Sequence, residues 1–143
     1  MAARLIVDAA RGFLGARFRH QGRSPEGMDC AGLVILVGRS IGALPDDLDV
    51  TAYARRPDGR SLVDHCRRHL DELYLGELSV GDVAVFKIET DPQHLAIVGD
   101  YPGGLLSMIH AYAPSHRVVE NRLDDAWSAR LVGAFRFRQV VAA

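Results

Sequence analysis

The chain opens with the pattern of an amphipathic helix. Apolar positions recur three and four residues apart, and Gly15 follows them as a helix stop. One face of this segment therefore needs a hydrophobic partner elsewhere in the chain. The positions that carry the pattern are Leu5, Ile6, Ala9, Ala10, Phe13 and Leu14.

A second helix is predicted from Ala31 to Leu44. Residues 15–28 before it contain several glycines and a proline among polar side chains, which is typical of a loop. Asp29 ends this loop and is a good N-cap for the helix. Since nearly every residue from Ala31 to Val37 is apolar, we expect the helix to be buried.

A third helix is predicted to begin at Ser61, with Asp64 three residues later. The preceding stretch from Leu44 to Arg60 contains prolines, glycine and several aspartates, and we expect it to form a long surface connection. The inner face of the third helix is marked by the apolar residues Leu62, Val63, Cys66, Leu70 and Leu73.

After Gly81 the pattern changes to that of β-strands. Short runs of β-branched and aromatic residues are separated by turn residues. Helices followed by strands predict an α+β fold, with N-terminal helices packed on an antiparallel sheet of about five strands and residues 1–143 forming one domain. The runs are Val83–Ile88, His94–Val98, Leu106–Tyr112, Arg117–Glu120 and Leu131–Phe137.

Composition narrows the classes of partner. The 143 residues include 17 basic and 18 acidic side chains, so the chain lacks the field that attracts nucleic acid or anionic lipid. Asp8 interrupts the first apolar stretch before it reaches the length of a signal-peptide core. No other run of apolar residues is long enough to span a membrane. We expect synthesis in the cytoplasm without a signal peptide, no membrane insertion and no nucleic acid partner. Cys30 and Cys66 are expected to be free thiols.

The candidate chemistry is centred on Cys30, which stands where the loop becomes the second helix. The N–H groups and dipole of a helix's first turn stabilise negative charge, so this position predicts a lowered thiol pKa and a nucleophile. His94 begins a strand with small neighbours and could act as the base. His110 lies one strand later and could hydrogen-bond His94, fixing the tautomer that faces Cys30. This set of residues suits acyl transfer.

Purely structural interpretations of the same residues stay open. A cysteine at a helix start is often a small buried apolar residue, and a strand histidine is often a hydrogen-bonded part of the core. His65 and His69 have the spacing of zinc ligands on a helix, but the glutamate of a metalloprotease motif and a third ligand are missing. We therefore predict no metal site, and a solvated helix face beside a buried Cys66.

Together these motifs resemble the NlpC/P60 superfamily of papain-like cysteine peptidases. The D-C-S-G-L nucleophile motif of that family corresponds to DCAGL at residues 29–33. Its G-D strand start corresponds to residues 81–82, its H-x-x-I strand to residues 94–97 and its I-H-A segment to residues 109–111. The resemblance extends from about Phe13 to Phe137 and implies a papain-like fold.

Within the superfamily, the chain resembles the phage cell-wall peptidase branch found in prophage tail modules and gene transfer agents. The R-H-Q of that branch corresponds to residues 19–21. Its W-x-x-R and G-A-F-R-F segments correspond to residues 127–130 and 133–137. The resemblance implies action on the cell wall, phage-tail-like proteins as partners, and a phage-like particle as a route to the wall.

The resemblance also implies roles for single residues. Cys30 would be the nucleophile, His94 the general base and acid, and His110 the orienter. Asp29 would bind the free amine of a stem-peptide L-alanine through charge-assisted hydrogen bonds, a role compatible with its function as an N-cap.

Two residues near the nucleophile depart from the family pattern. Phe18 stands where the family often has a tyrosine that stabilises the oxyanion, and Ala31 stands where serine is usual. Losing one oxyanion donor can slow a reaction on the order of a hundredfold. His20 or a partner protein could supply a replacement donor, and the backbone N–H groups near Cys30 are further candidates.

The resulting hypothesis is a cysteine endopeptidase that needs no metal or organic cofactor. By the resemblance, it would cleave the γ-D-glutamyl to diamino acid bond of peptidoglycan stem peptides. One alternative is a tail-assembly protein with the same fold and weak or no hydrolase activity, for which Phe18 is the main argument. Another is an amidase or acyltransferase that uses the same thiol and imidazole on a lipid or a small amide.

Overall fold

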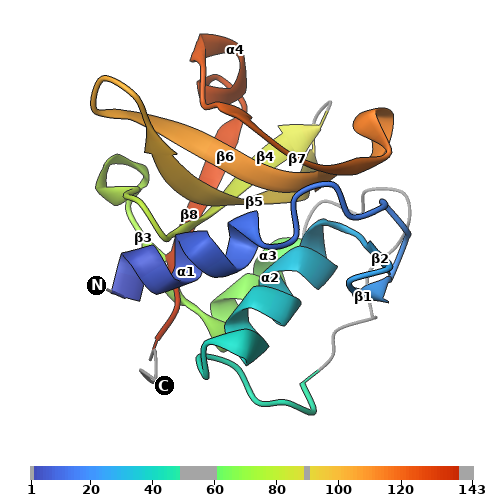
Figure 1. Cartoon of the computed structure of the whole chain (residues 1–143). Helices are drawn as coiled ribbons and strands as arrows, with labels where there is room; N and C mark the ends of the chain where they lie inside the picture. Colours follow the sequence, from blue (N-terminus) through green and yellow to red (C-terminus); the bar gives the residue numbers. More distant parts are fainter. Residues whose placement is uncertain (1, 49–60, 89–90, 139–143) are drawn as a thin grey trace.

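The computed structural model of the protein describes residues 2–48, 61–88 and 91–138. Helices α1 (Ala2–Arg11), α2 (Cys30–Ser40) and α3 (Ser61–His69) lie on one side of an antiparallel sheet, and the short helix α4 (Asp125–Ser128) lies on the other (Figure 1). The predicted α+β fold is confirmed. Most of the connection predicted between residues 44 and 60 lies outside the described residues.

Within the described residues, the main sheet has six strands in the order β3-β8-β4-β5-β6-β7. The prediction of about five strands is therefore one short. The extra strand, β3, has three residues, and its Leu73 fits the apolar spacing of α3 but pairs with Ala134 of β8 instead. The strands are β3 (Asp71–Leu73), β4 (Val83–Ile88), β5 (Asp91–Tyr101), β6 (Leu105–Tyr112), β7 (Arg117–Arg122) and β8 (Leu131–Arg136).

A small hairpin lies inside the segment predicted as a loop. It pairs β1 (Arg23–Ser24) with β2 (Gly27–Met28) directly before α2. Two single turns of 3₁₀-helix, η1 (Leu75–Glu77) and η2 (Ala113–Ser115), complete the described elements. Of the helices among the described residues, none has both the length and the apolar character needed to cross a membrane.

The sheet buries apolar side chains on both faces because alternate residues of a strand point to opposite sides. Residues such as Leu95 and Ile97 of β5 pack with α1 and α2 in the larger core. Their neighbours Ala96 and Val98 pack with Phe86 in a second cluster, which Trp127 of α4 partly covers. By this alternation, His94 and His110 belong to the face of the second cluster.

Strands β5 and β6, which carry His94 and His110, pair with each other along only part of their length. In the described register, β5 and β6 pair from Tyr101 and Leu105 as far as Ile97 and Ile109. His94 continues to pair with β4, opposite Phe86, whereas His110 continues to pair with β7. Helix α2 packs against both β5 and β6, the strands that carry these histidines.

Candidate active site

The loop before α2 is fixed by the carboxylate of Asp29. Its Oδ1 accepts hydrogen bonds from the Gly32 amide at 2.8 Å and from Nη1 of Arg23 at 3.0 Å. Its Oδ2 accepts a hydrogen bond from the Gln21 amide at 2.8 Å. The predicted N-cap is thus present, and the same side chain also joins the helix to the hairpin.

Gly32 allows the loop and helix to approach closely. A Cβ at this position would overlap the carbonyl oxygen of Gly22 and crowd the side chains of Arg23 and Met28. Because only glycine leaves this space, the DCAG segment brings the hairpin directly against the first turn of α2. Cys30 is held at that junction.

Cys30 is half-buried and not disulfide-bonded. A backbone hydrogen bond from Leu95, the residue after His94, reaches the thiol and favours the thiolate, as do the amides of Cys30 and Ala31. Burial, followed by the nearby charge of Asp29, outweighs these contacts and raises the pKa of Cys30 to about 12. The expectation that the helix start lowers this pKa is therefore wrong, because desolvation dominates at this site.

His94 and His110 form the hydrogen bond expected from the sequence. Nε2 of His94 lies 2.7 Å from Nδ1 of His110, and Nε2 of His110 lies 2.6 Å from Oδ1 of Asn121. Burial, and then the neighbouring His110, lowers the pKa of His94 to about 3. Burial also lowers the pKa of His110, while its hydrogen bond with Asn121 acts in the opposite direction. Both rings are neutral near pH 7.

Aromatic side chains enclose the two imidazoles. Trp127 lies 5.7 Å from the His94 ring centroid and 5.5 Å from that of His110. Tyr112 lies 5.6 Å from His94 and 5.1 Å from His110, also between ring centroids. Phe86 packs edge-on against Trp127. This wall removes water from the imidazoles, which accounts for the desolvation that lowers their pKa values.

A cysteine at a helix start and a hydrogen-bonded pair of buried imidazoles are side chains that thiol hydrolases use. The sequence profile of the NlpC/P60 family matches residues 15–136. The chain belongs to the NlpC/P60 family. No curated protein sequence matched the chain.

Solved structures share the NlpC/P60 fold of this chain. The NlpC/p60 domain of the peptidoglycan hydrolase SagA has a TM-score of 0.61 at 20% identity, covering 93% of this chain and 97% of that one. An NlpC/P60 family protein from Bacillus cereus ATCC 10987 has a TM-score of 0.67 at 22% identity, covering 96% and 40%. The peptidoglycan hydrolase RipB from Mycobacterium tuberculosis has a TM-score of 0.58 at 19% identity, covering 96% and 65%. This chain therefore spans less than two thirds of the last two.

The residues expected at the substrate-binding site of this NlpC/P60 chain are Asp29, Phe18, His20 and Ala31, and the last three lie in different environments. Phe18 is half-buried against the larger core, and its amide donates to the carbonyl of His116 at 2.9 Å. His20 has a side chain that is 25% exposed, with Nδ1 4.0 Å from Oδ2 of Asp29. Ala31 is buried on α2. His20 is therefore partly open to solvent beside Asp29, whereas Ala31 faces the interior.

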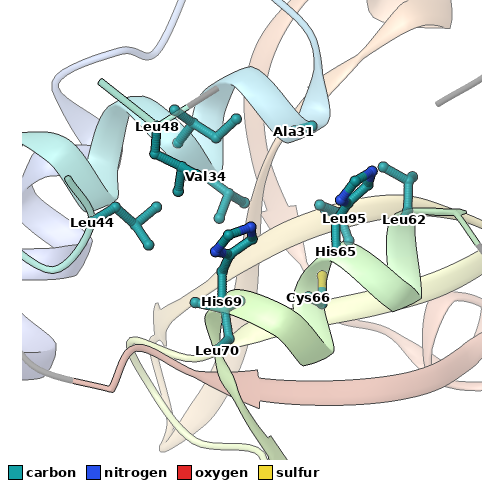
Figure 2. Close-up of a pocket in the computed structure, with 11 residues that line it drawn as sticks. Ala31, Val34, Leu44, Leu48, Leu62, His65, Cys66, His69, Leu70 and Leu95 are labelled. Atoms are coloured by element: carbon teal, nitrogen blue, oxygen red, sulfur yellow. The ribbon is translucent and has the colours of Figure 1, made fainter. Parts of the chain in front are cut away.

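An apolar pocket lies between α2, α3 and β5 (Figure 2). Ala31 and Leu95, which directly follow Cys30 and His94 in the sequence, both line it. Figure 2 shows His65 and His69 of α3 projecting toward this space, and both are half-buried rather than solvated. Arg67 and Arg68 between them are exposed, and Cys66 is buried as predicted. Across the described ranges, no group of three or more potential ligand side chains is arranged to hold a metal ion.

Sequence reasoning missed two residues that the NlpC/P60 fold brings to the site. Arg23 pairs with Asp29, and Asn121 bonds His110. The strand predicted at residues 117–120 stops one residue before Asn121, while β7 extends to Arg122. The available signal was alternation, since Asn121 shares its strand face with Val119, which pairs with His110.

Proposed function

We propose that this protein is a cysteine endopeptidase that hydrolyses amide bonds in peptidoglycan stem peptides. The observation that carries the proposal is the relation of Cys30 to the histidine pair. The thiol is hydrogen-bonded to the Leu95 amide, and His94, one residue earlier on β5, is joined to His110. The NlpC/P60 family supports this class of chemistry, because SagA and RipB are described as peptidoglycan hydrolases.

The first step of the proposed reaction starts from neutral groups. With the pKa of Cys30 raised to about 12 and that of His94 lowered to about 3, the resting site holds a thiol and a neutral imidazole. His94 takes the thiol proton as the sulfur attacks the amide carbonyl carbon. N–H groups of the first turn of α2 stabilise the negative charge that develops on the carbonyl oxygen.

Breakdown of the tetrahedral intermediate uses the same imidazole in the opposite direction. His94, now an imidazolium, donates its proton to the leaving nitrogen, and the carbon–nitrogen bond breaks to leave a thioester on Cys30. A water molecule then attacks the thioester while His94 accepts its proton. The carbon–sulfur bond then breaks and His94 returns that proton to the sulfur, which releases the thiol and the acid product without a cofactor.

The proposed scissile bond joins γ-D-glutamate to the diamino acid, on the strength of the family resemblance. In this proposal Asp29 also contacts the amine of the stem-peptide L-alanine. The Asp29 carboxylate already accepts hydrogen bonds from three groups of the protein, namely the amides of Gln21 and Gly32 and the side chain of Arg23. A substrate amine would therefore share Asp29 with Arg23.

We also propose that the enzyme acts as part of a phage-tail-like or prophage-associated particle, after synthesis in the cytoplasm. The support is the W-x-x-R and G-A-F-R-F pattern at residues 127–137. Trp127 of this segment contacts both imidazoles, so the pattern includes a residue of the candidate site. Peptidoglycan and phage-tail-like proteins are the partners that this setting implies.

The proposal is tested by incubating the purified protein with muropeptides and following the fragments by mass spectrometry. We expect the wild type to release a fragment ending in γ-D-glutamate and one beginning with the diamino acid. Cys30→Ala should release neither. If wild type and Cys30→Ala both leave every muropeptide intact across a range of pH, the enzymatic proposal is wrong.

One observation favours a second candidate, a tail-assembly protein with weak or no hydrolase activity. Phe18 offers no hydroxyl at the position where the family often has an oxyanion-stabilising tyrosine. The same muropeptide assay separates the two candidates. Identifying the products also detects amidase or acyltransferase chemistry, in which a different bond is cleaved or the acyl group passes to an acceptor.

A further inference from the structure

The geometry of β7 brings Asn121 within reach of the histidine pair. Asn121 lies opposite Met108, and Val119 lies opposite His110, so Asn121 is the diagonal neighbour of His110 on one face of the sheet. Its Oδ1 lies 2.6 Å from Nε2 of His110. Its Nδ2 donates to the Arg122 carbonyl at 3.1 Å, which orients the amide so that its oxygen faces the ring.

This orientation determines which ring nitrogens carry protons. An amide oxygen can only accept a hydrogen bond, so Nε2 of His110 must be the protonated nitrogen. In a neutral imidazole the other nitrogen is then an acceptor, and Nδ1 of His110 receives the proton of His94 Nε2 across 2.7 Å. Nδ1 of His94 is consequently left with its lone pair available.

We propose that Asn121 is a positioning residue that sets the tautomer of His94 through His110. The inference rests on the proposed function, since it concerns the imidazole that would deprotonate Cys30. With Nδ1 unprotonated, His94 can accept the thiol proton. The opposite tautomer presents an N–H at Nδ1 and cannot accept it. Asn121 thus selects the reactive form without contacting the reacting atoms.

Asn121 has a second effect once the proton has moved. Taking the thiol proton makes His94 an imidazolium, and its Nε2–H bond to His110 becomes charge-assisted. Any positive charge shared with His110 is stabilised by the amide oxygen at the far end of the relay. The same contact raises the pKa of His110 against the effect of burial. Asn121 therefore makes the buried pair more able to hold the transferred proton.

Two variants of nearly equal size separate hydrogen bonding from packing. Asn121→Leu keeps the volume and removes the acceptor, whereas Asn121→Asp keeps an acceptor oxygen. We expect Asn121→Leu to lower kcat on muropeptides on the order of a hundredfold with little change in KM, since the base is then in the wrong tautomer. Asn121→Asp is expected to recover most of the lost rate.

The tautomers can also be determined without an activity assay, by ¹⁵N NMR of the histidine side chains in the full chain. In the wild type we expect His94 and His110 both to carry the proton on Nε2, and in Asn121→Leu we expect this assignment to be lost. Glu120→Gln is the control, because Glu120 lies on the opposite face of the same strand and bonds Arg11 and Ser107. It should leave the tautomers and kcat unchanged.

The inference is wrong if wild-type His94 carries its proton on Nδ1, or if Asn121→Leu keeps both wild-type tautomers. If Asn121→Leu does not fold, the wild-type spectrum and the Asn121→Asp variant still decide the question. The NMR result stands apart from the proposed function. A protein with the expected tautomers and no hydrolysis would contradict the proposed function and leave the role of Asn121 in the relay supported.

Discussion

Arg23 and Asp29 form an ion pair at the start of α2, with Nη1 of Arg23 3.0 Å from Oδ1 of Asp29 and side chains 12% and 4% exposed. The same carboxylate caps the helix through the Gly32 amide. It also places a negative charge beside Cys30, which raises the pKa of that thiol in addition to the larger effect of burial. One side chain therefore stabilises the local fold and opposes ionisation of the Cys30 thiol.

Replacing Asp29 by asparagine should make the Cys30 thiol more reactive while destabilising the protein. Asparagine keeps an oxygen for the Gly32 amide but removes the charge that raises the pKa of Cys30. We expect the rate of Cys30 alkylation by iodoacetamide at pH 8 to 9 to rise about threefold or more, because more thiolate is present. Peptide mapping by mass spectrometry measures the rate at each thiol separately.

Asp82→Asn is a matched control for this experiment. Asp82 is as buried as Asp29, pairs with Arg136 at 2.8 Å and accepts the Ser79 amide at 2.8 Å. This variant should lose stability without changing the alkylation rate of Cys30. Equal rates for wild type and Asp29→Asn would show that the carboxylate does not govern the thiol.

The buried imidazoles should make the folded protein sensitive to acid. Histidine has an ordinary pKa of 6.5, whereas His94 in the folded protein has a pKa of about 3. As pH falls from 6.5 toward 3, the unfolded chain binds a proton that folded His94 does not, so the free energy of unfolding decreases by about 1.4 kcal/mol per pH unit. Above pH 6.5 His94 is neutral in both the folded and the unfolded state, so its titration no longer changes the free energy of unfolding.

Urea denaturation at pH 7, 6, 5 and 4 measures this dependence. His94→Gln should flatten the slope, because glutamine binds no proton in either state. Cys30→Ala leaves both imidazoles in place and should keep the wild-type slope. A His94→Gln protein with an undiminished acid slope would contradict the lowered pKa.

Gly32 should be intolerant of even the smallest side chain. A Cβ at this position would overlap the carbonyl oxygen of Gly22, which is backbone and cannot move alone. We expect Gly32→Ala to reduce the free energy of unfolding by about 2 kcal/mol or more and to displace the hairpin from α2. Thermal and urea denaturation measure the loss.

Gly76→Ala provides the comparison for Gly32. No heavy atom lies within 4 Å of a Cβ built at this position. This substitution should change the free energy of unfolding by less than about 0.5 kcal/mol. If both alanine variants are equally stable, the close approach of Gly22 and Gly32 does not constrain the site.

Restoring a hydroxyl at position 18 should speed the reaction. By the family resemblance, Phe18 corresponds to a tyrosine that often stabilises the oxyanion, and an additional donor aimed at the oxyanion can raise kcat by about tenfold to a hundredfold. We expect Phe18→Tyr to show this gain on muropeptides with little change in KM. Phe13→Tyr, at another half-buried phenylalanine of the same core, should show none. A Phe18→Tyr rate equal to that of wild type would mean that other donors already stabilise the oxyanion.

The parts of the fold that could be predicted from the sequence depend on nearby residues. The cap of α2 is one example, since Asp29 and Gly32 are three residues apart. The motif around Cys30 and the strand that begins near His94 are likewise readable from a few neighbouring positions. The contact between His94 and His110 could be predicted because the two lie on consecutive strands, which usually pair in an antiparallel sheet.

The sequence by itself therefore determined the succession of helices and strands, the position of the thiol at a helix start and the partnership of the two histidines. Only the tertiary structure decided that β3 pairs with β8, that Asn121 is hydrogen-bonded to His110 and that the Cys30 pKa is raised. The physical reason is the range of the interactions. Caps and periodicity act over three or four residues, whereas strand order, burial and desolvation depend on atoms brought together from distant parts of the chain.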